Sequence, residues 1–246
     1  MLKLIALNEG SYKFLKKSVP LNIKNNYNIT VQPFLLNIKN FTYLIDTGLG
    51  FIDNDYKNNT ILNNIEKYGY KHNDISKILI THLHPDHFGG LFRKNHNNKY
   101  EFNFPNSMIY VQKKEIEYFI DFYKNSLYSD MLQFLYNHKK TIFLNGNGVI
   151  DNIINYYITG GHTKYHQIFT LNNYNINYMF GGDIIAIPEH IDIKFKTSYD
   201  FDKTYAMYLR KKLTKIIHLN NYTCLLYHSK KYKIKVNFFE ERYFPY

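Results

Sequence analysis

Cysteine and tryptophan are the residues that this sequence most lacks. Its 246 residues include one cysteine and no tryptophan. A single cysteine excludes an internal disulfide and a cysteine-based zinc site and is compatible with a reducing cytosol, so we predict a cytoplasmic protein. Cys224 shares a predicted strand face with Leu226, which favours a small buried hydrophobe at that position.

Signals for membranes and secretion are also lacking. The first residues, MLKLIALNEGSYKF, have neither a long apolar region nor a small-residue cleavage site, so they do not fit a signal peptide. No apolar run reaches the length needed to cross a bilayer. We therefore expect a soluble protein without a membrane partner.

Acidic residues are fewer than basic ones, 20 against 31, which gives a formal net charge of +11. A basic protein is attracted to nucleic acid, anionic membranes or acidic substrates. Yet only Arg93, Arg210 and Arg242 carry the guanidinium group that suits phosphate recognition, and lysine has AT-rich codons. The composition favours a solvated lysine surface over a functional basic face. We expect a small-molecule substrate rather than nucleic acid, and a homodimer is compatible with the sequence.

The apolar pattern predicts an α/β fold. With 45% hydrophobic residues and no linker or repeat, the chain is expected to fold as a single domain over residues 1–246. Strands are predicted at 1–7, 28–38, 41–46, 77–81, 99–104, 107–111, 153–159, 165–171, 176–180 and 223–227. Helices are predicted at 58–68, at 112–138 as one or two helices, and near 202–217.

One stretch, THLHPDHFGG at 81–90, is unusually rich in metal-binding residue types. His82 and His84 point the same way only if the chain is extended there, and Pro85 disfavours a helix at His84. Asp86 and His87 follow the bend and can face a second centre. This pattern arises by chance in roughly one chain of this composition per thousand.

Three further candidate ligands follow predicted strands. His162 lies in ITGGHT, Asp183 in MFGGDI and His228 at the end of TCLLYH. Each alone is a weak signal, since a lone histidine or aspartate at a strand end is usually a cap or a surface residue. Together with the histidine-rich stretch they indicate one site, because the loops of an α/β sheet converge at strand ends.

This ordered set, with Asp46 in DTG ahead of it, resembles the metallo-β-lactamase fold superfamily. The resemblance runs from about Asp46 to His228. The stretch from GGDIIAIPEH to the predicted helix near 202–217 further resembles its lactonase-like and organophosphate-hydrolase-like bacterial branch. The resemblance implies a four-layer αββα sandwich with metals at one edge, between the sheets.

The resemblance also implies how the residues divide between two divalent metal ions. It assigns His82, His84 and His162 to one ion, Asp86, His87 and His228 to the other, and Asp183 to both. Asp46 would bind no ion and would instead hold a ligand histidine from the side that faces away from the ions. His190 would brace a ligand or contact substrate, with a purely structural histidine as the alternative. Imidazole and carboxylate ligands suit Zn²⁺, while iron and manganese also accept them.

The activity implied is that of a dinuclear metallo-hydrolase, esterase- or lactonase-like. Water activated between the ions would cleave a small ester, lactone or thioester, with Asp86 and Asp183 as the catalytic carboxylates. One departure argues against a plain quorum-signal lactonase: IIAIP follows Asp183, where such enzymes carry a tyrosine. The alternatives are a phosphodiesterase or RNA-processing nuclease of the same fold, or an inactive binding-only remnant.

The remaining histidines and one aromatic series match nothing in this pattern. His72, His96, His138, His166 and His218 are predicted to be surface or core residues. The series Tyr118, Phe119, Phe122, Tyr123, Tyr128 and Phe134 is predicted to be a packed helical face. Its alternative is a substrate wall, which would favour an apolar or acyl-bearing substrate.

Overall fold

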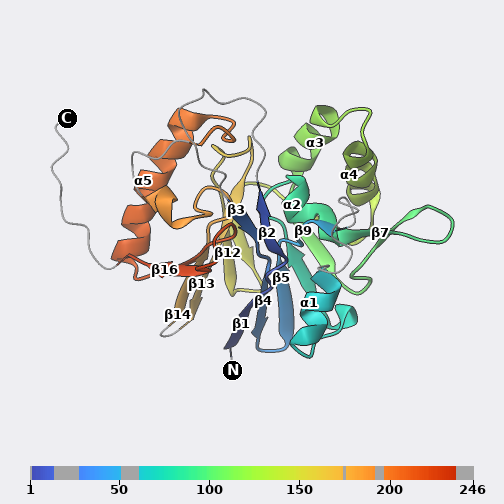
Figure 1. The fold of residues 1–246 in the computed structure, drawn as a ribbon, viewed down its shortest axis with the longest axis horizontal. Helices are drawn as coiled ribbons and strands as arrows, with labels where there is room; N and C mark the ends of the chain where they lie inside the picture. The colour runs from blue at the N-terminus through green and yellow to red at the C-terminus, as the bar shows by residue number, and fades with distance from the viewer. Residues whose placement is uncertain (1, 14–27, 51–60, 174–175, 192–196, 237–246) are drawn as a thin grey trace.

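The computed structural model describes residues 2–13, 28–50, 61–173, 176–191 and 197–236. These residues form two six-stranded sheets that pack face to face, with helices on the two outer faces (Figure 1). The predicted αββα order of layers is confirmed. Among the described residues no helix is both long enough and apolar enough to cross a membrane.

The first sheet has the strand order β1-β4-β5-β6-β9-β10. Its strands are β1 (Leu2–Ala6), β4 (Phe34–Ile38), β5 (Phe41–Ile45), β6 (Lys77–Leu79), β9 (Met108–Gln112) and β10 (Thr141–Leu144). Strands β5, β6, β9 and β10 run parallel, whereas β4 is antiparallel to both of its neighbours. The carboxyl ends of the parallel strands therefore meet at one edge.

The second sheet has the order β11-β12-β13-β14-β15-β16. Its strands are β11 (Gly148–Ile150), β12 (Ile154–Ile158), β13 (Gln167–Asn173), β14 (Ile176–Phe180), β15 (Thr223–Leu225) and β16 (Lys233–Lys235). Only β14 and β15 are parallel neighbours. Two hairpins stand apart from the large sheets: β2 (Gly10–Lys13) with β3 (Asn28–Val31), and β7 (Phe92–Lys94) with β8 (Tyr100–Phe102).

Alternation along the strands divides the core into layers. In β5, Tyr43 and Ile45 face the second sheet, while Leu44 faces the helices on the outer side. In β14, Phe180 faces the first sheet and Met179 faces the outer helix. A strand buried on both faces reads as a continuous apolar run, which is why β5 and β6 are recognisable in the sequence.

Helices cover both outer faces because each presents one apolar stripe to a sheet. Helices α1 (Ile61–Lys67), α3 (Lys113–Phe122) and α4 (Leu127–Asn137) pack on the first sheet, and α5 (Lys203–Leu219) packs on the second (Figure 1). Asp202 caps α5 by accepting a hydrogen bond from the Tyr205 N–H. The short helices are α2 (Pro85–Phe88), η3 (His72–Asp74), η4 (Gly89–Leu91) and η5 (Pro188–Ile191).

The structure corrects several predicted boundaries. The strand predicted at 28–38 is two strands in different sheets, separated at Gln32 and Pro33, because proline supplies no N–H to a ladder. The segment 112–138 is two helices. Residues 58–60 of the predicted helix 58–68 lie outside the described residues. Cys224 is fully buried beneath α5, as predicted. Strands β2, β7, β10, β11 and β16, of three or four residues each, were not predicted.

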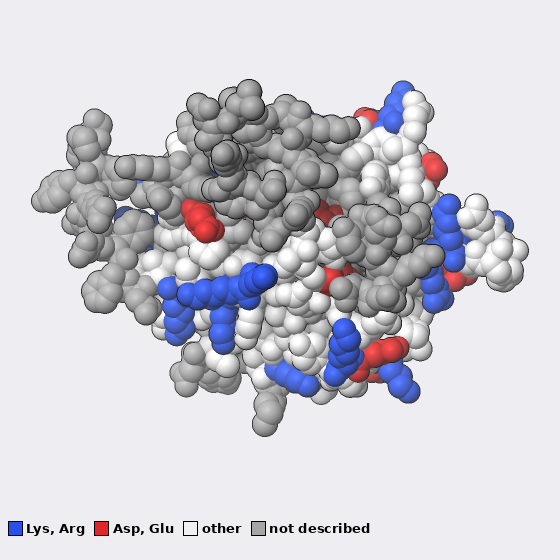
Figure 2. All heavy atoms as spheres, viewed as in Figure 1, with Lys and Arg blue, Asp and Glu red and all other residues white. Residues whose placement is uncertain are grey.

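The charged surface is uneven on the face that Figure 2 shows. Basic side chains gather at the end of the molecule where β16 lies in Figure 1. Lys233 and Lys235 of β16, and Lys231 just before it, are exposed.

Candidate metal centre

The candidate ligands gather because the strands that precede them end at the same edge. Asp46 follows β5 and His82 follows β6, its parallel neighbour. Asp183 follows β14, and His228 follows β15, again a parallel neighbour. His162 lies in the loop that enters β13, which is antiparallel to β14 and so begins at the same edge. The topology alone brings these loops together.

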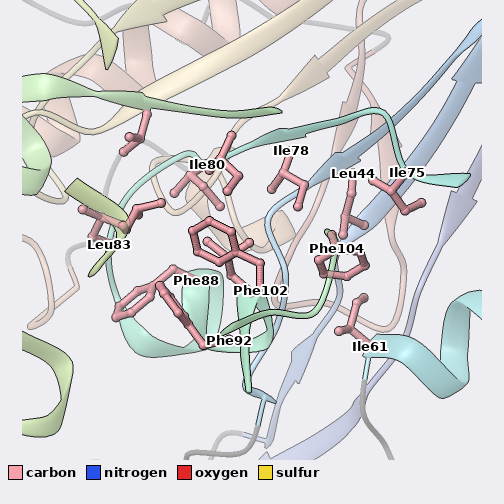
Figure 3. Close-up of a cluster of buried hydrophobic side chains, with 14 of the residues drawn as sticks. Leu44, Ile61, Ile75, Ile78, Ile80, Leu83, Phe88, Phe92, Phe102 and Phe104 are labelled. Atoms are coloured by element: carbon pink, nitrogen blue, oxygen red, sulfur yellow. The ribbon is translucent and has the colours of Figure 1, made fainter. Parts of the chain in front are cut away.

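The histidine-rich loop is fixed by apolar residues that alternate with its ligands. Leu83 and Phe88 are completely buried in the cluster between the first sheet and its helices (Figure 3). His84 has extended backbone, with φ −78° and ψ 146°, and Pro85 opens α2 directly after it. Burial of Leu83 thus turns His82 and His84 away from the core and toward the site.

The first ligand group contains His82, His84, His162 and Asp183, whose ligand atoms all lie within 4.8 Å of one another. The Nδ1 atom of His84 is 3.0 Å from Nε2 of His82 and 3.0 Å from Nε2 of His162. Three imidazole nitrogens thus face a common point. A single cation of ordinary size can be shared by such a set.

The second group contains Asp86, His87 and His228, again with ligand atoms within 4.8 Å of one another. Asp183 joins the two groups. Its Oδ1 is 3.2 Å from Nε2 of both His87 and His228, while its Oδ2 is 3.3 Å from Nε2 of His162. The structure brings all seven predicted ligands together in the predicted grouping.

Asp46 lies behind the second group, where the sequence predicts it. Its Oδ2 accepts a hydrogen bond from His87 Nδ1 at 2.8 Å and another from the Thr81 hydroxyl at 2.7 Å. Its Oδ1 accepts the Thr81 N–H at 2.8 Å. This arrangement places the proton of His87 on Nδ1 and leaves Nε2 facing the site.

Asp200 contacts a histidine of the first group in the way that Asp46 contacts His87 of the second. The sequence did not predict this role for Asp200. Its Oδ1 is 3.1 Å from His162 Nδ1, and both of its oxygens accept hydrogen bonds from Arg210 at 2.8 and 3.0 Å. Arg210 also donates to the Ile184 carbonyl next to Asp183. A buried carboxylate–guanidinium pair therefore connects the His162 loop, the Asp183 turn and α5.

His166, predicted to be a surface or core residue, is buried against the ligands. Its Nε2 accepts the N–H of Asp183 at 3.1 Å, and its Nδ1 is 2.7 Å from the Thr159 hydroxyl. Gly182 has φ +49°, and a Cβ there would lie 2.5 Å from His166 Nε2. The glycine before Asp183 is thus required for this contact, a signal that the sequence carried.

Two more residues, Tyr227 and Glu115, fix the loops that carry the ligands but belong to neither ligand group. Tyr227 stacks on His87 with ring centroids 4.0 Å apart, and its hydroxyl donates to the Asp86 carbonyl at 2.6 Å. Glu115 of α3 accepts hydrogen bonds from the Leu83 N–H and from the Thr163 hydroxyl. Burial raises the pKa of Glu115 to about 7 against the effect of these hydrogen bonds.

His190 is buried, and its Nδ1 accepts the Ala186 N–H at 3.1 Å, within the turn that follows Asp183. It belongs to neither ligand group. Burial, together with the nearby Arg210, lowers the pKa of His190 to about 3, so the ring is neutral. Its contact braces the turn, and a contact with substrate remains a prediction. His72, His96, His138 and His218 also lie outside both groups.

The two groups differ in charge. Burial and the neighbouring histidines hold the pKa of His82 well below its usual range and lower that of His84 to about 3. Burial also opposes the charge on His87, but Asp183, Asp86 and Asp46 outweigh it and raise the pKa of that ring. The pKa of Asp183 is held low despite burial, chiefly by His228 and His87. A central carboxylate beside the neutral rings of His82 and His84 suits a cation, and His87 would release its added proton when an ion binds.

A metal ion fits the donors at this point. His87 Nε2 and Asp183 Oδ1 are buried and make no hydrogen bond of acceptable geometry among the described residues, although they face each other. A buried polar atom without a partner costs about 1–3 kcal/mol. Nitrogen and carboxylate oxygen are the donors that zinc and similar divalent ions accept, and such an ion would satisfy both atoms.

The site opens on the side of Asp86 and is bordered there by aromatic rings. The Asp86 side chain is 25% exposed, whereas that of His87 is completely buried. The ring of Phe119 lies 5.7 Å from that of His84 and 5.5 Å from that of Phe122, which is 62% exposed. Phe119 is itself 2% exposed, so this face of α3 is packed, as predicted, and the ring of Phe122 extends its apolar surface to solvent.

Comparison with known proteins identifies the family and the fold of the chain. The family profile described as the metallo-beta-lactamase superfamily matches residues 30–228. None of the curated proteins compared with the chain matches its sequence.

Solved structures share the fold over nearly the full chain. A probable metal-dependent hydrolase from Staphylococcus aureus superposes with a TM-score of 0.77 at 23% identity, covering 92% of this chain and 89% of its own. The dizinc quorum-quenching lactonase AidC, solved with a product, gives 0.74 at 21% identity, with 97% and 95% covered. The hydrolase AbOPH gives 0.76 at 21% identity, with 97% and 96% covered. At such low sequence identity, these superpositions establish a shared fold and nothing more.

Proposed function

This chain belongs to the metallo-beta-lactamase superfamily, and from that premise we propose that it is a dinuclear metallo-hydrolase that cleaves a small ester, lactone or thioester. The observation that carries the proposal is the pair of ligand groups joined by Asp183. All seven ligand positions carry residues that can bind a metal, which argues against a binding-only remnant. The lactonase AidC, described as dizinc, has the same fold and supports zinc as the metal.

In the proposal, His82, His84, His162 and Asp183 hold one ion, and Asp86, His87, His228 and Asp183 hold the other. Two bound divalent ions would supply Lewis acidity and a water that ionises near neutral pH. Asp46 and Asp200 keep the ring protons of His87 and His162 on the nitrogens that face away from the ions. The Thr30 carbonyl oxygen lies 2.8 Å from Nδ1 of His228 and keeps the ring proton of His228 on that nitrogen.

Asp86 is the ligand carboxylate nearest to solvent, and its Oδ2 lies 3.5 Å from His228 Nε2. We assign it the transfer of the proton: the Asp86 carboxylate would take the proton that the attacking water loses and would deliver it to the departing oxygen or sulfur. Asp183, more deeply enclosed, keeps its negative charge throughout, which its surrounding histidines stabilise. No serine or cysteine nucleophile is required.

The aromatic border supports an apolar group on one side of the scissile bond. From His84 a chain of ring contacts runs through Phe119 and Phe122 to Tyr118, and Tyr118 contacts Phe201 at 6.1 Å. Phe201 is 59% exposed. The exposed rings of Phe122 and Phe201 would bind an acyl or aryl group through the apolar area that binding removes from water.

The proposal is tested by hydrolysis assays of the purified chain reconstituted separately with Zn²⁺, Mn²⁺ and Fe²⁺. Aryl esters, lactones and thioesters form the panel. We expect turnover of at least one class, at least a hundredfold lower in Asp183→Asn and unchanged in His96→Ala, an exposed histidine outside both groups. No turnover with any metal, or full activity in Asp183→Asn, would overturn it.

A further inference from the structure

Basic residues are dense near the end of the described chain. Residues 203–236 contain eight lysines and one arginine but no aspartate or glutamate, although the whole chain has 20 acidic residues. The arginine, Arg210, is buried and paired with Asp200. Surface lysines fixed by codon usage alone would be expected to be interspersed with acidic residues. A run of basic residues without acidic ones favours a locally positive surface.

Part of this charge lines a hollow at the free edge of the second sheet. A cavity of about 540 Å³ lies beside β14, β15 and β16, with Lys231, Lys233 and Lys235 around it. In the register of the sheet Lys235 pairs with Thr223 and Lys233 with Leu225, so these lysines stand on the face of Thr223. We call this hollow the lysine groove. Figure 2 shows basic side chains gathered at this end.

Most side chains that line the lysine groove are polar, and an aromatic ring and two isoleucines, Ile176 and Ile234, complete the lining. Asn177, Asn221 and Thr223 line it with amide and hydroxyl groups, and Tyr178 lines it with its ring. None of its lining residues is among the exposed large hydrophobic side chains of the described chain. A membrane-binding surface combines lysines with exposed apolar residues, so the groove does not fit a lipid surface.

Part of the groove lies away from the metal centre. Thr223 begins β15, whose other end leads to His228, and Ile176 begins β14, whose other end leads to Asp183. A ligand bound at Thr223 and Lys235 would therefore lie at the opposite end of β15 from His228, whereas Lys231 follows His228 by three residues.

From these observations we propose that the lysine groove is a docking site for single-stranded nucleic acid, separate from the hydrolytic site. The lysines would pair with backbone phosphates, the amides would hydrogen-bond to sugars and bases, and the Tyr178 ring would stack on an unpaired base. Because lysine is a point charge without the bidentate geometry of arginine, binding is independent of base sequence and strongly dependent on salt.

The test measures fluorescence anisotropy of a labelled 20-nucleotide oligouridylate titrated with the full chain at several salt concentrations. Three lysine-to-glutamine substitutions at Lys231, Lys233 and Lys235 are compared with the same substitutions at Lys94, Lys99 and Lys139, which are also exposed. Both variants lose three charges. We expect the groove variant to bind at least tenfold more weakly and to lower the slope of log affinity against log salt by about 2. The control variant should bind like the unmodified chain.

Absence of salt-dependent binding by the unmodified chain would overturn the proposal, as would equal weakening in the two variants. Binding to phosphatidylserine vesicles without binding to the oligonucleotide would also overturn it and assign the groove to membranes. Ester hydrolysis by the groove variant should remain unchanged. The docking proposal and the proposed hydrolase activity can thus fail independently.

Discussion

At the residue scale, the candidate centre depends on side chains that stand behind its ligands. His87 is held by Asp46, His162 by Asp200, His228 by the Thr30 carbonyl and His82 by the Thr81 hydroxyl, which lies 3.0 Å from its Nδ1. These contacts fix which ring nitrogen faces the site. The metal affinity of the site should therefore respond to residues that touch no ion.

Asp200→Asn tests this dependence most directly. The substitution removes the charge that pairs with Arg210, which is 1% exposed, and weakens the hold on His162. Breaking a buried pair costs about 3–5 kcal/mol, and losing the partner of a ligand histidine costs about 10–100-fold in metal affinity. Urea unfolding and zinc titration measure the two effects.

The matched control for Asp200→Asn is Asp202→Asn, two residues away. Asp202 caps α5 from an exposed position, and asparagine caps a helix equally well. Its stability and metal affinity should stay unchanged. A loss in Asp200→Asn no larger than that of this control would contradict the assigned role.

Glu9 predicts a specific dependence of stability on pH. It is 1% exposed, its Oε2 accepts the Leu49 N–H at 2.8 Å, and its Oε1 has no hydrogen-bond partner among the described residues. Burial, with a contribution from Asp86, raises its pKa from 4.5 to about 8. The folded chain therefore holds this proton more tightly than the unfolded chain, and the free energy of unfolding falls as pH rises between about 4.5 and 8.

Glu9→Gln cannot ionise and should not show this fall. In chelator-treated protein, the stability of the variant relative to the unmodified chain should increase by up to about 1.4 kcal/mol for each pH unit across that window. Urea unfolding at pH 5, 6, 7 and 8 measures it, with Glu66→Gln, on the exposed side of α1, as the control. A stability difference that stays constant with pH would show that Glu9 does not retain its proton.

At the element scale, sequence reasoning succeeded for long apolar strands and for the ligands that follow them. Strands β5 and β6 are buried on both faces and are readable as apolar runs, so Asp46 and His82 could be placed at strand ends. The three-residue strand β16 carries two lysines and one isoleucine and has no such pattern. Asp200 lies in a polar stretch, 38 residues from the histidine that it holds, and no spacing rule links the two.

The contact between η4 and the turn that follows β5 gives a prediction that involves no ligand. A Cβ at Gly90 would lie 1.9 Å from the Thr47 carbonyl oxygen, and Thr47 in turn binds the His87 carbonyl through its N–H at 2.7 Å. Gly90→Ala should therefore displace the Asp46 turn and cost about 3 kcal/mol, with lower metal occupancy.

Gly69→Ala provides the comparison for Gly90→Ala. Gly69 has φ +81°, but a Cβ added there would meet nothing within 4 Å. Only the left-handed backbone is therefore penalised, by about 1–2 kcal/mol, and metal occupancy should be unaffected. Thermal unfolding and elemental analysis of both variants distinguish the two effects. Normal metal content in Gly90→Ala would contradict the proposed coupling.

At the scale of the whole molecule, the two sheets are joined at both ends of their strands. The metal centre joins them at one end. At the other, Asp151 in the β11–β12 turn of the second sheet pairs with Lys77 of β6 and accepts a hydrogen bond from the Tyr43 hydroxyl of β5 at 2.5 Å. The sequence offered no sign of this contact, because its partners are distant along the chain and of common types.

Asp151→Ala should destabilise the chain by about 2 kcal/mol, since it leaves Lys77 and Tyr43 without their shared acceptor. Hydrolytic activity at permissive temperature should be retained, because the contact is remote from the metal centre. The control is Glu101→Gln, which breaks the exposed pair with Arg93 and should change stability little. Equal melting temperatures for both variants would contradict the structural role of Asp151.

The central claim is that the seven gathered ligands hold two metal ions. The most direct test is elemental analysis of chain purified without chelator, beside Asp183→Ala. We predict about two divalent ions per chain and a sharp drop in the variant, because Asp183 reaches the histidines of both groups. Little or no metal in the unmodified chain, or an unchanged content in Asp183→Ala, would contradict this claim.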